Sequence, residues 1–295
     1  MNEQLDFQAV RDGLKSIFAR RDISAISFSL NGKALSLYLG KAVLAGGLFL
    51  IAWVLFTYLP VTYQDWTVAF RPAALRWDNP YYEGWRIFNP PWLFPILYPI
   101  ALLPPAAGGG LLILISIIVV AVYVGSPSKM FFVICSASMV GLITLGQLDA
   151  LLLLGLMMPK GLGIPVLMLK PQGVFLAILP RLNRWSILVT VLILGISVLI
   201  WGFWWENILA NQPNAGVNIS LFPYTVLPGL ILAFYGLKRK SDAFLCVASL
   251  CLAPYFMIHS MIPAVVAIIK ETDNWRWWTA TVLGTWLYFL MMKGF

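Results

Sequence analysis

Charged residues are scarce in this sequence. Only 12 of the 295 residues are Asp or Glu and 20 are Lys or Arg, so that 11% of the chain is charged while 60% is hydrophobic. Because soluble globular domains carry about 25% charged residues, this composition excludes an ordinary soluble domain. It is typical of an integral membrane protein.

Residues that bind metals are scarce as well. The chain has one histidine, His259, and three cysteines, Cys135, Cys246 and Cys251. The cysteines lie in apolar runs without the spacing of a metal site. We therefore expect no metal centre, and we expect the cysteines to be small buried hydrophobic residues.

The basic residues outnumber the acidic ones, and the net charge is +8. They fall in short loops between apolar runs, so the positive-inside rule of membrane proteins accounts for them better than a nucleic-acid partner does. Residues 1–34 hold five of them, which predicts a cytoplasmic N-terminus. Phe7, Val10 and Leu14 share one helical stripe in this segment. This pattern indicates that residues 1–34 form an amphipathic segment on the membrane surface, and a frayed cytoplasmic tail stays open as the alternative.

Long apolar runs predict the fold. Residues 42–59, 107–124 and 185–205 contain no charged side chain, and runs of this length are typical of membrane helices. We predict an all-α, polytopic membrane protein with about nine to eleven membrane helices, at about 20 residues per span. Residues 35–295 would form one transmembrane domain, in which a first span over 36–60 places residues 61–91 outside the cell as the first extracytoplasmic loop.

Three apolar stretches do not fit simple spans. Residues 130–158 and 243–269 are too long for one membrane span, and residues 161–180 contain Lys170 and Pro171. We predict broken helices there, whose free backbone groups are buried in protein or face a wet cavity. Ionisable residues within such stretches are usually functional. For residues 92–104 both a complete span and a half-length helix stay open.

The predicted topology brings a set of polar residues to the outer face. The acid Asp65 and His259 lie on that side, with the cations Arg71, Arg76 and Lys170. A carboxylate can take a proton from an attacking hydroxyl, and cations stabilise the charge that grows on a departing phosphate. This set predicts the transfer of a group from a phosphate-bearing lipid.

Five short segments follow one another in a characteristic order. They are QDWTVAFRPAALRWDNPYYE (64–83), NPPWLFPILYPIALLPP (89–105), GQLDALLLLGL (146–156), LKPQGVFLAILP (169–180) and LAPYFMIHSMIP (252–263). Together they resemble the family-87 glycosyltransferases, which are GT-C fold enzymes that depend on polyprenyl-phosphate mannose. The family has a loop Asp after its first span, a short juxtamembrane helix and a Pro-Tyr segment, which are matched here by Asp65, residues 70–74 and residues 79–81.

The resemblance implies a function. It implies a hexosyltransferase of the cell membrane with its active site on the extracytoplasmic face, which moves mannose with inversion from a polyprenyl-phosphate donor to a lipid or glycan acceptor. No metal or other cofactor is implied. Asp65 would be the general base, and His259 would pair with that base or with the donor phosphate. The further residues implied to bind substrate are Arg71, Arg76, Tyr81, Gln147, Asp149, Lys170 and Gln172.

Two positions depart from the family pattern. Asp149 stands where the family usually has Asn, and Ala253 stands where it has Ser before proline. A second carboxylate could repel an anionic donor or serve a different acceptor. Two other functions therefore stay open: a non-catalytic GT-C-like subunit of a larger membrane complex, and a transporter of lipid-linked sugars, which broken helices and intramembrane charges also fit.

Overall fold

The computed structural model describes residues 63–81, 87–159, 162–210 and 217–293. All of them belong to one unit, Ala45–Phe295. The predicted amphipathic segment 1–34 and the predicted first span over 36–60 lie outside the described residues, as does part of the loop 61–91. The description below concerns the described ranges alone.

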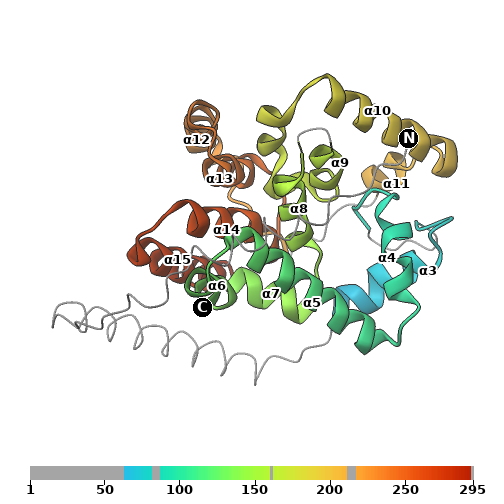
Figure 1. Cartoon of the computed structure of the whole chain (residues 1–295), viewed down its shortest axis with the longest axis horizontal. Coiled ribbons are helices and arrows are strands. Elements are labelled where there is room, and N and C mark those ends of the chain that lie inside the picture. Colours follow the sequence, from blue (N-terminus) through green and yellow to red (C-terminus); the bar gives the residue numbers. More distant parts are fainter. Residues whose placement is uncertain (1–62, 82–86, 160–161, 211–216, 294–295) are drawn as a thin grey trace, which may run out of the picture. The chain divides into compact units, whose positions relative to one another are not determined.

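Every regular element in these ranges is a helix, which confirms the predicted all-α class for this part of the chain (Figure 1). The first elements are η2 (Trp66–Phe70), α3 (Arg71–Leu75), α4 (Leu93–Ala101), α5 (Pro105–Val124), α6 (Pro127–Ile134), α7 (Ala137–Leu145), η4 (Asp149–Leu151), α8 (Leu152–Met157) and α9 (Gly163–Leu167). The remaining elements are η5 (Pro171–Gly173), η6 (Phe175–Arg181), α10 (Arg184–Trp201), α11 (Trp205–Ala210), α12 (Val226–Arg239), α13 (Asp242–Leu252), η8 (Ile258–Met261), α14 (Ile262–Glu271) and α15 (Trp275–Lys293). The element η2 is a turn of π-helix, and the other η elements are 3-10 turns.

Two described helices, α5 and α10, are long and apolar enough to cross a membrane. They correspond to the predicted runs 107–124 and 185–205, although α10 ends at Trp201 because Gly202 leaves the helical conformation with a φ of +65°. The pair α6 and α7 adds a third candidate span if its two halves are counted together. Two or three spans support a membrane protein, and the larger number of about nine to eleven stays a prediction.

The three apolar stretches that the sequence marks as irregular are broken in the structure. The axes of α6 and α7 meet at 70°. The run 161–180 contains only α9 and the short turns η5 and η6, and the run 243–269 is interrupted by residues 253–257, between α13 and η8. The open question over residues 92–104 is also answered. Helix α4 has nine residues, or about 14 Å at 1.5 Å per residue, which is half a bilayer.

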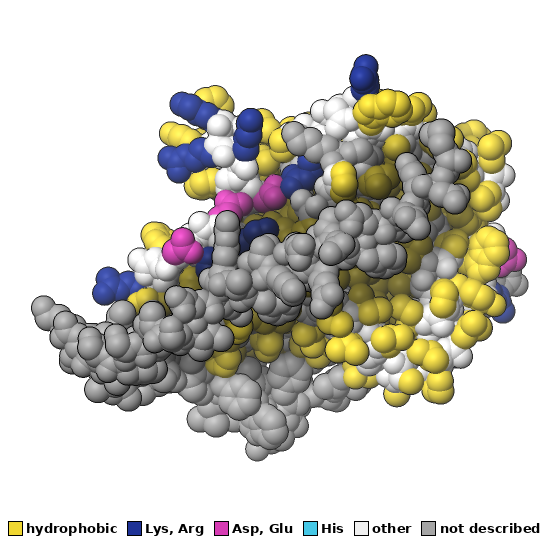
Figure 2. Space-filling view, viewed as in Figure 1, with side chains coloured by type: hydrophobic (Ala, Val, Ile, Leu, Met, Phe, Trp, Pro, Cys, Tyr) yellow, Lys and Arg dark blue, Asp and Glu magenta, His cyan; other side chains and the backbone are white. Residues whose placement is uncertain are grey.

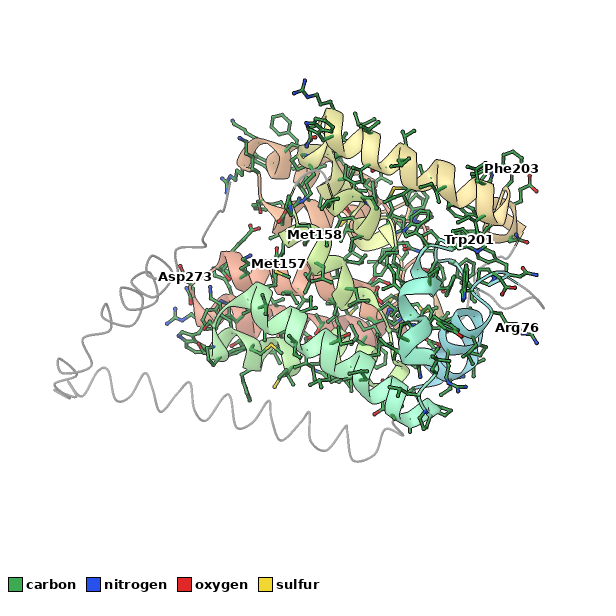
Figure 3. All side chains as sticks on the ribbon, turned by 45° about the vertical axis from the view of Figure 1, so that its right-hand side comes forward. Arg76, Met157, Met158, Trp201, Phe203 and Asp273 are labelled. Carbon is green, nitrogen blue, oxygen red and sulfur yellow. The ribbon has the colours of Figure 1, made fainter. Side chains whose placement is uncertain are left out.

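Burial separates an inner helix from an outer one. In α5, 50% of the apolar stretch is buried within the protein, whereas in α10 only 11% of the apolar stretch is buried. Leu188, Leu192 and Leu199 on α10 are more than half exposed, and hydrophobic side chains cover much of the visible described surface (Figure 2). Such an apolar surface fits contact with lipid. The far end of α10 contacts the first loop, since the Trp201 indole donates a hydrogen bond of 2.7 Å to the backbone oxygen of Trp77, beside Arg76 (Figure 3).

A bidentate ion pair connects η6 to α13. The two terminal guanidinium nitrogens of Arg181 each lie 2.9 Å from one carboxylate oxygen of Asp242. The same nitrogens donate to the backbone oxygens of Ala177 and Leu156. Because the bidentate pair also satisfies two free carbonyls, it is a structural connection.

The segment that carries Asp65 is fixed against the end of α7. The backbone N–H of Tyr63 donates to the backbone oxygen of Thr144 at 3.1 Å. Trp66 is fully buried, and its indole N–H donates to the backbone oxygen of Pro105 at 3.0 Å. Gly146 ends α7 with a φ of +71°, and a Cβ atom there would lie 2.9 Å from the Cβ of Trp66. A residue without a side chain is therefore required where the two segments meet.

We expect Gly146→Ala to destabilise the protein. The left-handed conformation costs a residue with a Cβ about 1–2 kcal/mol, and the contact with Trp66 adds to this cost. The matched control is Gly110→Ala in α5, where a Cβ meets no atom within 4 Å. Thermal unfolding in lipid nanodiscs, followed by tryptophan fluorescence, should show a lower midpoint for Gly146→Ala only. Equal midpoints for the two variants would contradict this packing.

Candidate functional site

Five polar side chains from four separate segments form one connected cluster. The Gln147 amide N–H₂ donates to the Asp65 carboxylate, and the Gln147 amide oxygen lies 3.1 Å from Lys170 Nζ. Lys170 Nζ is 2.9 Å from Asp149 Oδ2, and His259 Nδ1 is 2.8 Å from the same oxygen. The chain of contacts therefore runs from Asp65 to His259, the only histidine of the sequence.

The contacts define the proton positions in the cluster. An ionised carboxylate only accepts hydrogen bonds, so the ring N–H at His259 Nδ1 donates to Asp149 Oδ2. The contact of 3.2 Å between Lys170 Nζ and His259 Nδ1 is then not a hydrogen bond. An ammonium group has three N–H donors. Two of those on Lys170 are used by Gln147 and Asp149, and the third is left for another acceptor.

Burial increases from one end of the cluster to the other. Asp65 is partly exposed, the Lys170 side chain is 17% exposed, and the Asp149 and His259 side chains are fully buried. A buried carboxylate is costly unless it is paired. Asp149 meets this condition at Oδ2, which has two partners, a cation and a ring N–H, whereas its Oδ1 has no hydrogen-bond partner among the described residues.

Close backbone approaches place these residues. Gly173 follows the Lys-Pro-Gln segment, and a Cβ atom there would lie 2.5 Å from the backbone oxygen of Ser260. This contact brings η5 against η8, the turn that carries His259. On the other side, the Asn89 side-chain amide donates to the backbone oxygen of Leu169 at 2.8 Å, directly before Lys170. The Lys-Pro-Gln segment is thus held between the first loop and η8.

A cavity of about 100 Å³ lies at the exposed end of the cluster. Asp65, Gln147 and Lys170 contribute to its wall, so one space reaches both an acid and a cation. The other lining residues are Ala69, Phe70, Ile87, Phe88, Asn89, Gln172, Tyr255, Phe256, Met257 and Ser260. Three of these lining residues have polar side chains and were not predicted from the sequence: Asn89, Tyr255 and Ser260.

The structure brings some of the predicted site residues to this cavity and not others. Asp65, Gln147, Lys170 and Gln172 line it, and Asp149 and His259 stand behind Lys170. Arg71, Arg76 and Tyr81 do not line it.

For each of these three residues there is a physical reason why it does not line the cavity. Arg71 lies six residues beyond Asp65, and helical neighbours on one face are three or four residues apart. Arg76 follows the end of α3 and is exposed. Tyr81 donates its hydroxyl to the backbone oxygen of Asn89 at 2.7 Å. Burial raises the pKa of this phenol far above its usual range, so Tyr81 is a neutral donor that positions Asn89.

Two of the three residues that were missed have one feature in common. Asn89 precedes a Pro-Pro pair, and Tyr255 follows Pro254 in the interruption between α13 and η8. Polar residues beside prolines within apolar runs are the signal that finds them, because such breaks form the walls of cavities in membrane proteins.

Comparison with known proteins gives no match: no protein-family model, no curated protein and no solved structure is significantly similar to this chain.

We expect the Lys170–Asp149 pair to show strong energetic coupling. Lys170→Met leaves a buried carboxylate without its cation, which typically costs about 3–5 kcal/mol. Asp149→Asn removes the counter-charge of Lys170 and should also destabilise the protein. The double variant should lose less than the sum of the two, because it contains no unpaired buried charge. Denaturant unfolding of the four proteins in one micelle system measures this coupling.

The control for this comparison of single and double variants is the ion pair Lys129–Asp273. Its N–O distance is also 2.9 Å, but the Asp273 side chain is 99% exposed. Exposed ion pairs contribute little, so Asp273→Asn should leave the unfolding midpoint unchanged. Additive effects of Lys170→Met and Asp149→Asn would mean that the two side chains do not pair in the membrane.

Proposed function

We propose that the protein is a membrane glycosyltransferase that moves a hexose, mannose in the first instance, from a polyprenyl-phosphate donor to a hydroxyl of an outer-leaflet lipid or glycan. The observation that carries the proposal is the shared cavity. A partly exposed carboxylate, Asp65, and a cation with an unused donor, Lys170, both line it. The order of five segments that resembles the family-87 glycosyltransferases supports the same reaction.

The reaction in this proposal is a single displacement. The acceptor oxygen forms a bond to the anomeric carbon of the sugar, and the proton of the acceptor hydroxyl passes to the Asp65 carboxylate. The bond between the anomeric carbon and the phosphate oxygen breaks, and its electron pair leaves with the polyprenyl phosphate. The anomeric centre is inverted because one displacement takes place.

Lys170 has a defined role in this step. Its third N–H is available to a phosphate oxygen, and it stabilises the charge that the leaving phosphate gains. Asp149 and Gln147 hold the ammonium group in place, and His259 supports Asp149 from behind. Asp149, which departs from the family pattern, is thus the ion-pair partner of Lys170. It does not line the cavity as a second free carboxylate.

Gln147 connects the two chemical roles. It accepts from Lys170 with its oxygen and donates to Asp65 with its nitrogen. A donated hydrogen bond orients the carboxylate, and it leaves the second oxygen of Asp65 available for the acceptor proton. The sidedness follows the positive-inside rule, with basic residues at the cytoplasmic face and the cavity at the extracytoplasmic one.

Replacing the base should abolish transfer without unfolding the protein. We expect Asp65→Asn to lower the transfer rate by about 10²–10⁴-fold, the usual contribution of a general base. The asparagine amide can still accept a hydrogen bond from Gln147, so thermal stability should be kept. The assay follows labelled mannose from polyprenyl-phosphate mannose into a crude lipid extract, with purified protein in nanodiscs.

The control is Asp78→Asn, which changes an exposed carboxylate of the same loop that does not line the cavity. Its rate should equal that of the wild type. Wild-type transfer by Asp65→Asn would disprove Asp65 as the base. Absence of transfer by the wild type, together with a fixed co-purifying partner, would favour the non-catalytic subunit, and movement of the lipid-linked sugar across liposomes without product would favour the transporter.

A further inference from the structure

Two buried polar atoms in the cavity wall have no hydrogen-bond partner among the described residues. They are the hydroxyl of Tyr255 and the side-chain amide oxygen of Gln172. Tyr255 lies in the loop between α13 and η8, and Gln172 lies in η5. Both residues line the cavity that also contains Asp65 and Lys170.

Unpaired polar atoms of this kind are unfavourable for the protein alone. A buried donor or acceptor without a partner costs about 1–3 kcal/mol. Five other residues of the described part also have a buried polar atom without a partner, but none of them lines this cavity: Arg71, Ser116, Ser138, Asp149 and Thr190. Two such atoms at one cavity therefore indicate groups that are satisfied by a ligand.

The two atoms are chemically complementary. A phenol hydroxyl can donate a hydrogen bond, whereas an amide oxygen accepts hydrogen bonds and cannot donate them. Burial, and after it the negative charge of Asp65, raises the pKa of the Tyr255 phenol, so this hydroxyl is a neutral donor at physiological pH. An alcohol hydroxyl of a ligand can accept from Tyr255 and donate to Gln172 at the same time.

The reaction geometry decides which molecule supplies this alcohol. In a single displacement the attacking oxygen, the anomeric carbon and the leaving oxygen lie roughly in line. In the proposed reaction Asp65 acts at the attacking end and Lys170 at the leaving end, so the sugar ring occupies the cavity that both residues line. Tyr255 and Gln172 line the same cavity and have no role at either end. This reasoning rests on the proposed glycosyl transfer.

We propose that Tyr255 and Gln172 bind one ring hydroxyl of the transferred hexose and thereby select the sugar. A site that hydrogen-bonds a substrate hydroxyl rejects the analogue that lacks it by as much as about 10⁴–10⁵-fold, because its own polar groups are then left unpaired. One monodeoxy form of the donor sugar should thus be excluded far more strongly than the others.

Thermal stability in the absence of donor is the first measurement. Tyr255→Phe and Gln172→Leu each remove an unpaired buried atom, so their unfolding midpoints should equal or exceed that of the wild type. Tyr224→Phe is the matched control, because Tyr224 is 88% exposed and does not line the cavity. A clear loss of stability in Tyr255→Phe would show that its hydroxyl has a structural partner, and it would overturn the proposal.

Sugar discrimination is the second measurement. The wild type, the two variants and Tyr224→Phe are supplied with polyprenyl-phosphate mannose and with its 2-, 3-, 4- and 6-deoxy derivatives, and kcat/KM is measured for each. We expect the wild type and the control to use one deoxy donor at least about 100-fold less well. Tyr255→Phe should lose about 10-fold or more on mannose and should show little further loss on that one deoxy donor. An equal loss on all five donors would overturn the proposal.

Donor binding separates this inference from the proposed function. Quenching of tryptophan fluorescence measures the Kd of the same five donors for Asp65→Asn, with and without Tyr255→Phe. Suppose that the wild type transfers no sugar, that the Asp65→Asn protein still binds one deoxy donor more weakly than the others, and that Tyr255→Phe removes this difference. The proposed sugar site is then supported, and the proposed transferase reaction is not. If binding does not distinguish the five donors, the sugar site fails whatever the rate of transfer.

Discussion

The buried carboxylate of Asp149 is the constraint on which the arrangement of the site depends. A charge in a fully buried position is tolerated only with close partners, and its two partners come from other segments, Lys170 before η5 and His259 in η8. Three broken stretches of chain must therefore meet around one oxygen atom. Gly173, whose missing side chain lets η5 approach Ser260, makes that meeting sterically possible.

The cluster extends from this buried charge to a cavity that Asp65, Gln147 and Lys170 line. Gln147 forms hydrogen bonds with both Lys170 and Asp65. Gly146 allows the segment that carries Asp65 to lie against the end of α7. An acid on the first loop and a cation in a broken helix thus share a small cavity. The apolar surface of α10 and the half-length helix α4 belong to a scaffold suited to a bilayer.

The sequence predicted the helical class and the broken stretches because both follow from local features, apolar runs interrupted by Pro, Gly and ionisable residues. The sequence also singled out Asp65, Gln147, Lys170 and His259 through the order of weak segments. The structure brings these side chains together, and their roles stay a prediction. The sequence could not predict that Asp149 pairs with Lys170, because pairing across 21 residues depends on tertiary contacts. The same reason explains why Arg71 was expected at the site, while Tyr255 was not considered.

The most direct measurement is a cryo-electron microscopy structure of the Asp65→Asn protein in nanodiscs, bound to polyprenyl-phosphate mannose and an antibody fragment. Glycosyl transfer at this cavity predicts that the phosphate lies within hydrogen-bond distance of Lys170 Nζ and that the anomeric carbon faces residue 65. A donor bound with its phosphate away from Lys170, or with its sugar outside the cavity, would contradict it.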